Sequence, residues 1–139
     1  MYTGRRMATK KKTSAGKKRI LVVEDEQALR EMYAQWLSAK GYEVDTADNG
    51  LTGIQKAFHD APDAVVLDVL LPKKDGFEVL AEIRRNPKTE NLPVVILSSL
   101  DQDFEQKQGI NLGAHLYLVK TTISPEILYD AVEKIMKKG

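Results

Sequence analysis

The chain has 139 residues, of which 42% are hydrophobic, enough for one compact domain with a core and too few for two ordinary domains. It has no cysteine, which excludes disulfides and thiolate metal sites and favours a reducing compartment. No apolar run approaches the roughly 20 residues of a membrane helix, and the basic N-terminus lacks the apolar segment of a signal peptide, so the sequence predicts a cytoplasmic protein.

The net charge of +1 conceals an uneven distribution along the chain. Residues 1–19 hold eight of the 21 Lys and Arg side chains and none of the 20 acidic ones, so the remainder carries a net charge of −7. Because this segment has few large apolar side chains, we predict a disordered basic tail over residues 1–18 and one domain over residues 19–138. The tail could attract nucleic acid, but no recognition motif accompanies the charge, and a solvated extension explains it as well.

From Arg19 onward, short apolar runs alternate with helical patterns. The predicted strands, rich in Val, Ile and Leu, are RILVVED, YEVDTA, DAVVLD, PVVILSS and HLYLVK. Between and after them, apolar residues recur at helical spacing over residues 29–37, 51–58, 77–83, 104–112 (weakly) and 127–135. Ser124 and Pro125 suit the N-cap and first position of the last helix.

Five successive strand–helix units predict an α/β fold, a doubly wound parallel sheet with five helices on both faces. The first, third and fourth strands are almost wholly apolar, as expected for strands covered on both sides. The second strand alternates apolar and polar residues and the fifth is mixed, which places both at the edges. The strand order 2-1-3-4-5 of flavodoxin-like folds satisfies this pattern.

Polar residues end four of the predicted strands. They are Glu24 and Asp25 after the first strand, Asp68 after the third, Ser98 at the end of the fourth, and Lys120 after the fifth. Because ligands bind beyond the carboxyl ends of such strands, these side chains should share one cleft.

A cleft with three carboxylates and one lysine needs a further positive charge. Mg²⁺ fits, since it prefers a few carboxylates together with waters and phosphate oxygens. One of the carboxylates could then act as a nucleophile and form an aspartyl-phosphate, with Lys120 and the Ser98 hydroxyl contacting the phosphoryl oxygens.

Five motifs in order resemble one family, the receiver domains of two-component response regulators, of the single-domain, chemotaxis-like kind. They are ILVVEDE, ADNG, VVLDVLLPKKDG, LPVVILSS and GAHLYLVK. The resemblance runs from about residue 18 to residue 137, and the order and spacing of the motifs make it specific.

The resemblance implies that Asp68 accepts a phosphoryl group from a histidine kinase or a histidine phosphotransfer protein, with Mg²⁺ as cofactor. The implied metal ligands are Asp25, Asp68, the backbone carbonyl of Leu70 and, through water, Glu24. Ser98 and Lys120 match the family's phosphate-binding positions, and Tyr117 matches its switch aromatic. The implied output surface is the face around the fourth helix, fifth strand and fifth helix.

Two features depart from the family's pattern. The family usually has a proline after the lysine, commonly with a cis peptide bond, whereas Thr121 follows Lys120 here. Either a costly non-proline cis bond is retained, or the bond is trans and the loop differs. In addition, Leu70 and Leu100 occupy the positions that influence the hydrolytic water, and an apolar side chain cannot orient water. We therefore expect slow self-dephosphorylation.

Other functions remain open from the sequence. A Mg²⁺-dependent phosphohydrolase also uses an aspartyl-phosphate, although the Asp-x-Asp pairing of one large class is absent at Asp68. A receiver-like scaffold that is not phosphorylated is the other alternative. Because no output domain follows the predicted receiver within the sequence, we expect the signal to pass to a separate effector protein, without membrane or nucleic-acid binding.

Overall fold

The structure is a computed structural model that describes residues 16–138. Most of the predicted tail, residues 1–18, lies outside this range, so the prediction of disorder there stays a prediction. Within the described part, no helix combines the length and apolar character needed to cross a membrane.

The five strands form one parallel sheet in the order β2-β1-β3-β4-β5, which confirms the predicted topology. The strands are β1 Arg19–Val23, β2 Glu43–Ala47, β3 Ala64–Leu67, β4 Val94–Ser98 and β5 Leu116–Val119. Every residue of the three inner strands is buried, while β2 and β5 are mostly half-buried. The apolar pattern of each strand thus predicted its place in the sheet.

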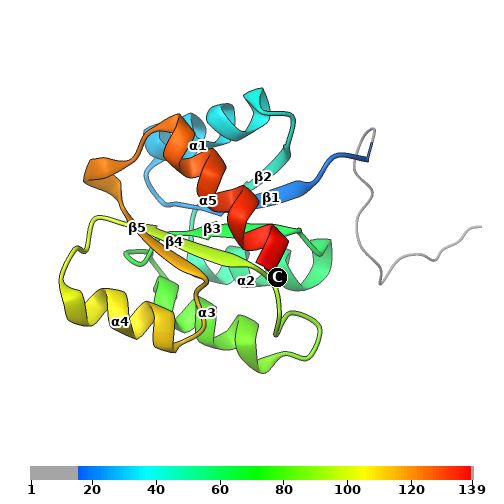
Figure 1. Ribbon diagram of the computed structural model, residues 1–139. Helices are drawn as coiled ribbons and strands as arrows, with labels where there is room; N and C mark the ends of the chain where they lie inside the picture. Colours follow the sequence, from blue (N-terminus) through cyan, green and yellow to red (C-terminus); the bar gives the residue numbers. More distant parts are fainter. Residues whose placement is uncertain (1–15, 139) are drawn as a thin grey trace, which may run out of the picture.

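The helices cover both faces of the sheet (Figure 1). They are α1 Gln27–Ala39, α2 Gly50–Asp60, α3 Gly76–Arg85, α4 Asp103–Asn111 and α5 Pro125–Lys138, with a short 3₁₀ helix, Lys120–Thr122, before the last. Alternate residues of β1 point to opposite faces: Leu21 packs in the cluster with α2 and α3, and Ile20 packs in the cluster with α1 and α5.

Local signals fix where three helices begin. The Asn49 side chain accepts a 2.9 Å hydrogen bond from the Thr52 N–H at the start of α2. Asp75 and Glu78 form a reciprocal capping box at the start of α3. The Ser124 hydroxyl accepts a hydrogen bond from the Ile127 N–H, as the sequence predicted for α5. These caps hold the helices that border the carboxyl ends of β1, β3 and β5.

Two glycines allow the loop after β3 to pack tightly against helix starts. A Cβ atom on Gly76 would overlap the carbonyl oxygen of Asp68, and one on Gly50 would overlap the carbonyl oxygen of Lys74. The Gly76 N–H donates a 2.8 Å hydrogen bond to the Val69 carbonyl. The backbone of Asp68 is therefore held directly against the first residue of α3.

Candidate phosphoacceptor site

The polar residues predicted at the strand ends gather at the carboxyl ends of the strands, on the left side of the sheet in Figure 1. Register explains why, because Leu67 of β3 pairs with Val23 of β1 and with Ile96 of β4. Glu24 and Asp68 therefore follow directly paired residues, although 44 positions separate them in the sequence. The parallel sheet thus brings together side chains that the chain keeps apart.

Three carboxylates form the centre of this site. Glu24, Asp25 and Asp68 each offer an oxygen, and these atoms all lie within 4.8 Å of one another. Glu24 and Asp68 are only 2% and 4% exposed, whereas Asp25 is exposed. Burial raises the pKa of Glu24, and the nearby Asp68 charge adds to this rise, while hydrogen bonds from Lys120 and the Glu26 N–H oppose it. The group is a concentrated negative charge open to solvent at Asp25.

Lys120 is the cation that contacts this group. Its Nζ atom lies 2.7 Å from Glu24 Oε1 and 3.0 Å from Asp68 Oδ2. Burial of the ammonium group opposes its charge, but the hydrogen bonds to the two carboxylates outweigh burial and raise the pKa of Lys120. One lysine therefore bridges two of the three acids and makes no recorded contact with Asp25.

The peptide bond after Lys120 resolves one of the alternatives left by the sequence. No peptide bond among residues 16–138 is cis, so Lys120–Thr121 is trans. Lys120 and Thr121 instead begin the 3₁₀ helix, in which the Thr122 hydroxyl donates to the Val119 carbonyl. With this trans bond, Lys120 still reaches Asp68.

Ser98 and Tyr117 lie beside the acidic group on β4 and β5. Ser98 is fully buried, and its hydroxyl accepts a 3.3 Å hydrogen bond from the Leu100 N–H. The Tyr117 hydroxyl donates a 2.8 Å hydrogen bond to the Leu100 carbonyl. Burial raises the pKa of Tyr117, and a hydrogen bond with the Ser98 side chain opposes this rise. Both residues thus contact the segment that leads from β4 to α4.

Arg30 is a residue of this site that the sequence analysis missed. Its guanidinium donates from α1 to the carbonyls of Glu24, at 3.0 Å, and Asp25, at 3.2 Å. It therefore fixes the backbone that carries two of the acids. Nothing in the sequence distinguishes Arg30 from an ordinary polar residue of an amphipathic helix. Leu70, by contrast, was predicted through its carbonyl, and the structure records its N–H 3.4 Å from Asp68 Oδ1.

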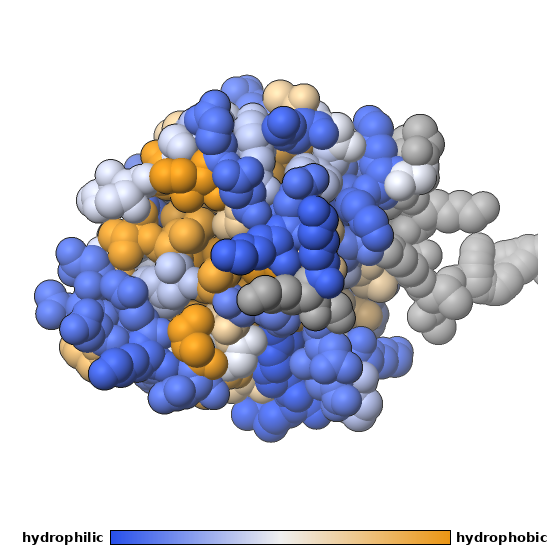
Figure 2. All heavy atoms as spheres, in the orientation of Figure 1, coloured by the Kyte–Doolittle hydropathy of each residue, from blue (hydrophilic) through white to orange (hydrophobic). Residues whose placement is uncertain are grey.

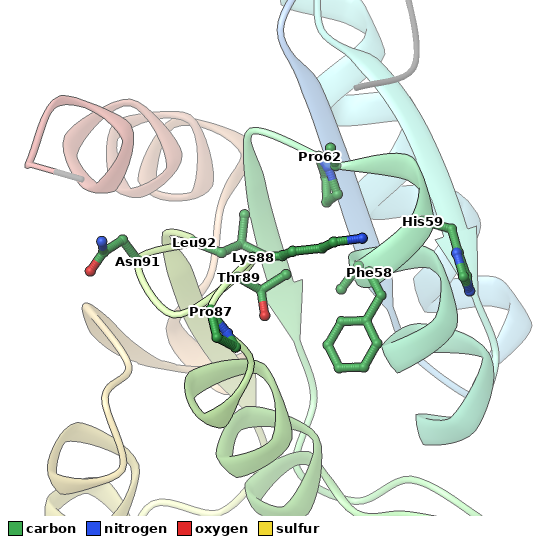
Figure 3. A pocket seen from close by; sticks show the side chains of 10 residues that line it. Phe58, His59, Pro62, Pro87, Lys88, Thr89, Asn91 and Leu92 are labelled. Carbon is green, nitrogen blue, oxygen red and sulfur yellow. The ribbon is translucent and has the colours of Figure 1, made fainter. Parts of the chain in front are cut away.

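A separate cavity of about 420 Å³ lies at the opposite side of the sheet, near the amino ends of β3 and β4 (Figure 3). Figure 3 shows Lys88 extending toward the segment that carries Phe58 and Pro62. None of the described residues that line this cavity is an aspartate or a glutamate. The three acids and Lys120 lie instead at the carboxyl ends of the strands.

Comparison with known proteins agrees with this geometry. The sequence model described as "Response regulator receiver domain" matches residues 20–133. The chain belongs to the response regulator receiver domain family. The sheet order predicted from the strand pattern occurs together with the three acids and the lysine that the resemblance had named.

Individual receiver proteins are similar over most of this chain. The alkaline phosphatase synthesis transcriptional regulatory protein PhoP of Bacillus subtilis is 36% identical over 88% of this chain and 50% of its own length. The response regulator MprA of Mycobacterium leprae is 38% identical over 79% of this chain and 47% of its own length. The chain therefore spans about half the length of these relatives. Among solved structures, the chemotaxis protein CheY4 of Vibrio cholerae is 28% identical, with a TM-score of 0.81 over 86% of this chain and 99% of its own.

Proposed function

We propose that this receiver domain accepts a phosphoryl group on Asp68 from a phosphohistidine donor and thereby changes its partner-binding surface. The observation that carries the proposal is the position of Asp68. Its carboxylate is 4% exposed, lies within 4.8 Å of oxygens of two other acids, and contacts Lys120 at 3.0 Å. A buried carboxylate in this setting can act as a nucleophile only if its surroundings balance the charge of the acids and of the phosphoryl group.

The donor set fits a Mg²⁺ ion. Three carboxylate oxygens that lie within 4.8 Å of one another can share a hard divalent cation, and Asp25 makes no ion pair with any residue of the described range 16–138. Asp25, Asp68 and the Leu70 carbonyl would hold the ion, with Glu24 acting through water. When bound, Mg²⁺ would neutralise the acids and the phosphoryl oxygens.

The chemistry is a transfer between two nucleophiles. An Asp68 carboxylate oxygen forms a bond to phosphorus while the P–N bond of the phosphohistidine breaks, and the imidazole nitrogen keeps the electron pair of that bond. The product is an acyl phosphate on Asp68. The Lys120 ammonium group already contacts Asp68 and can donate a hydrogen bond to an oxygen of the transferred phosphoryl group. Ser98 would contact a second oxygen, which requires that its fully buried hydroxyl become accessible.

Phosphorylation of Asp68 can alter the conformation of the face formed by α4, β5 and α5. Figure 2 shows apolar side chains gathered over β5 between these helices. Phe104 and Ile110 of α4 are 67% and 47% exposed, and a hollow of about 310 Å³ between α4 and β5 includes Tyr117. Because Tyr117 also bonds the Leu100 carbonyl near Ser98, phosphate contacts at Ser98 would shift the conformations available to this face.

Self-dephosphorylation should be slow. Leu70 is 53% exposed, and Leu100 packs against the core. Neither side chain offers a hydrogen bond that could orient a water molecule for attack on the acyl phosphate. A Leu70→Asn variant, which adds an amide at an exposed position, should lose its phosphoryl group faster than the parent protein. A parent half-life of only a few seconds in Mg²⁺ buffer would contradict slow hydrolysis.

Intact mass after incubation with Mg²⁺ and acetyl phosphate or phosphoramidate tests the proposed function. We expect a mass increase of one phosphoryl group that is absent in Asp68→Asn and absent when EDTA is present during the reaction. Glu90→Gln, an exposed acid outside the acidic group, is the matched control and should be phosphorylated like the parent. A folded protein that gains no phosphoryl group from either donor would instead be a receiver-like scaffold. Repeated turnover of a small phosphate ester would indicate a phosphohydrolase.

A further inference from the structure

A groove between the end of α1 and the outer face of α5 is not used by the proposed phosphotransfer. It has a volume of about 260 Å³ and is lined by Lys40, Tyr42, Glu126, Tyr129, Asp130 and Glu133. A second hollow of about 320 Å³ shares Tyr42 and Glu133 with it and continues to Lys18, Met136 and Lys137. The two hollows form a continuous path along α5 to the point where the chain enters β1. We call this path the α5 groove.

The first hollow of the α5 groove combines negative charge with aromatic rings, because its lining holds three acids and one lysine, whereas the second hollow adds Lys18 and Lys137. Glu126, Asp130 and Glu133 are all exposed and are spaced four and three residues apart, so they lie on one face of α5. Within residues 16–138, none of the three makes a recorded ion pair. Like charges at this spacing destabilise a helix, so the pattern favours a positively charged partner on this face.

The groove already holds one ammonium group. Lys40 Nζ lies 5.1 Å from the centre of the Tyr129 ring, within the distance of a cation–π interaction. Tyr42 and Glu133 line both hollows, and burial raises the pKa of Tyr42, with the charge of Glu133 adding to this effect. Aromatic faces with carboxylates beside them bind lysine and arginine side chains well.

We propose that the α5 groove binds the basic segment of the same chain, residues 5–12. This segment carries Arg5, Arg6, Lys10, Lys11 and Lys12, and residues 1–19 contain no acid that could compete for these cations. The charges are complementary at the first hollow, where the described lining holds Glu126, Asp130 and Glu133 against one lysine, Lys40. A partner that binds the outer face of α5 would then have to displace the segment.

The geometry of the chain permits this contact. Lys18, which lines the groove, is six residues from Lys12, and an extended chain of that length spans at most about 20 Å. The acids from Glu133 to Glu126 cover roughly 10 Å of helix. A tether this short gives an effective concentration of the order of millimolar, so weak individual contacts are enough.

Paramagnetic relaxation enhancement on the full chain tests the proposal. The protein has no cysteine, so Ala8→Cys gives a single attachment site for a nitroxide label. At low salt we expect the amide signals of Tyr129, Asp130 and Glu133 to broaden. The signals should recover at about 0.5 M NaCl, where the Debye length falls to a few ångströms.

Matched variants separate specific binding from general attraction between a basic segment and an acidic domain. Asp130→Asn with Glu133→Gln should reduce the broadening along α5 several-fold, as should Lys10→Gln, Lys11→Gln and Lys12→Gln together. Glu90→Gln with Asp101→Asn removes the same two charges from other exposed positions and should leave the broadening unchanged. Equal broadening in the two acidic double variants, or none along α5 at low salt in a folded protein, would overturn the proposal.

Discussion

The ammonium group of Lys120 lies 2.7 Å from Glu24 Oε1, slightly closer than to Asp68 Oδ2 at 3.0 Å. The lysine therefore balances part of the charge of two buried acids and is already beside the oxygen that we propose as nucleophile. This relationship gives Lys120 a structural role that can be measured without any phosphoryl donor.

Lys120→Met should destabilise the protein in Mg²⁺-free buffer. The substitution leaves Glu24 and Asp68 buried without their cation, and hydrogen bonds to charged groups contribute about 1.5–3 kcal/mol each. We expect a loss of that size in the free energy of unfolding, measured by urea denaturation, and partial recovery on adding Mg²⁺. The half-exposed pair between Lys74 and Glu82 offers a control, because Lys74→Met should cost less than about 1 kcal/mol and gain nothing from Mg²⁺. Equal losses in the two variants would argue against a special role for Lys120.

Asp25→Asn should have the opposite effect in the absence of metal. Asp25 is exposed, lies in the acidic group and has no ion-pair partner within the part of the chain that the structure describes, so it contributes mainly repulsion. We expect its removal to raise the free energy of unfolding in EDTA by about 0.5–1 kcal/mol. We expect Mg²⁺ to raise the melting temperature of the parent protein and expect this increase to disappear largely in Asp25→Asn. Glu90→Gln should change neither quantity, and retention of the full Mg²⁺ effect in Asp25→Asn would remove Asp25 from the ligand set.

Tyr117→Phe removes the hydroxyl that bonds the Leu100 carbonyl while keeping the ring. A neutral hydrogen bond contributes about 0.5–1.5 kcal/mol, and because the hydroxyl also bonds the Ser98 side chain, we expect at least that loss in the free energy of unfolding, measured as a lower urea midpoint. Phosphorylation of Asp68 should continue, since Tyr117 does not contact its carboxylate. Tyr129→Phe is the control, because no hydrogen bond of its hydroxyl is recorded among residues 16–138, and its midpoint should stay near that of the parent. Loss of phosphorylation in Tyr117→Phe would contradict a role restricted to the output face.

Gly76→Ala should destabilise the protein although alanine is the better helix former. The added Cβ would overlap the Asp68 carbonyl oxygen and lie 2.7 Å from Val69 Cα, and backbone atoms cannot move aside as side chains do. We expect a loss of about 1–3 kcal/mol together with slower phosphorylation, because the backbone of Asp68 must shift. In Gly109→Ala the nearest atom is Ile96 Cδ1 at 2.8 Å, the end of a side chain, so its loss should be smaller. The reverse order of the two losses would show that the loop after β3 can relax.

Asp45 provides a test of pH dependence away from the acidic group. Burial opposes its charge, but Lys56, with Nζ 2.9 Å from Asp45 Oδ1, and other hydrogen bonds outweigh burial and lower the pKa of Asp45. A lowered pKa in the folded state contributes stability that is present above the unfolded value of about 3.9 and is lost as pH falls through the folded value. Asp45→Asn should therefore reduce the urea midpoint at pH 7, and its difference from the parent should shrink below pH 4. A difference that persists unchanged at pH 3 would rule out the ionised carboxylate as its source.

The sequence by itself determined the order of the elements and the type of sheet. Continuous apolar runs and one alternating run predicted which strands lie inside and which at the edges. A strand covered on both faces needs apolar residues throughout, whereas a strand covered on one face needs them only at alternate positions. Ser124 marked the start of the last helix for a similarly local reason, since a cap needs only residues two or three positions away.

Only the tertiary structure decided how the site is held together. Strand register places Asp68 beside Glu24. Lys120, at the start of the 3₁₀ helix and followed by a trans peptide bond, contacts both acids. No sequence pattern predicted that Arg30 bonds the backbone carbonyl of Glu24 or that Gly76 approaches the carbonyl of Asp68 closely. These contacts join residues up to 96 positions apart, and a residue's own neighbours in sequence carry no information about such distant partners.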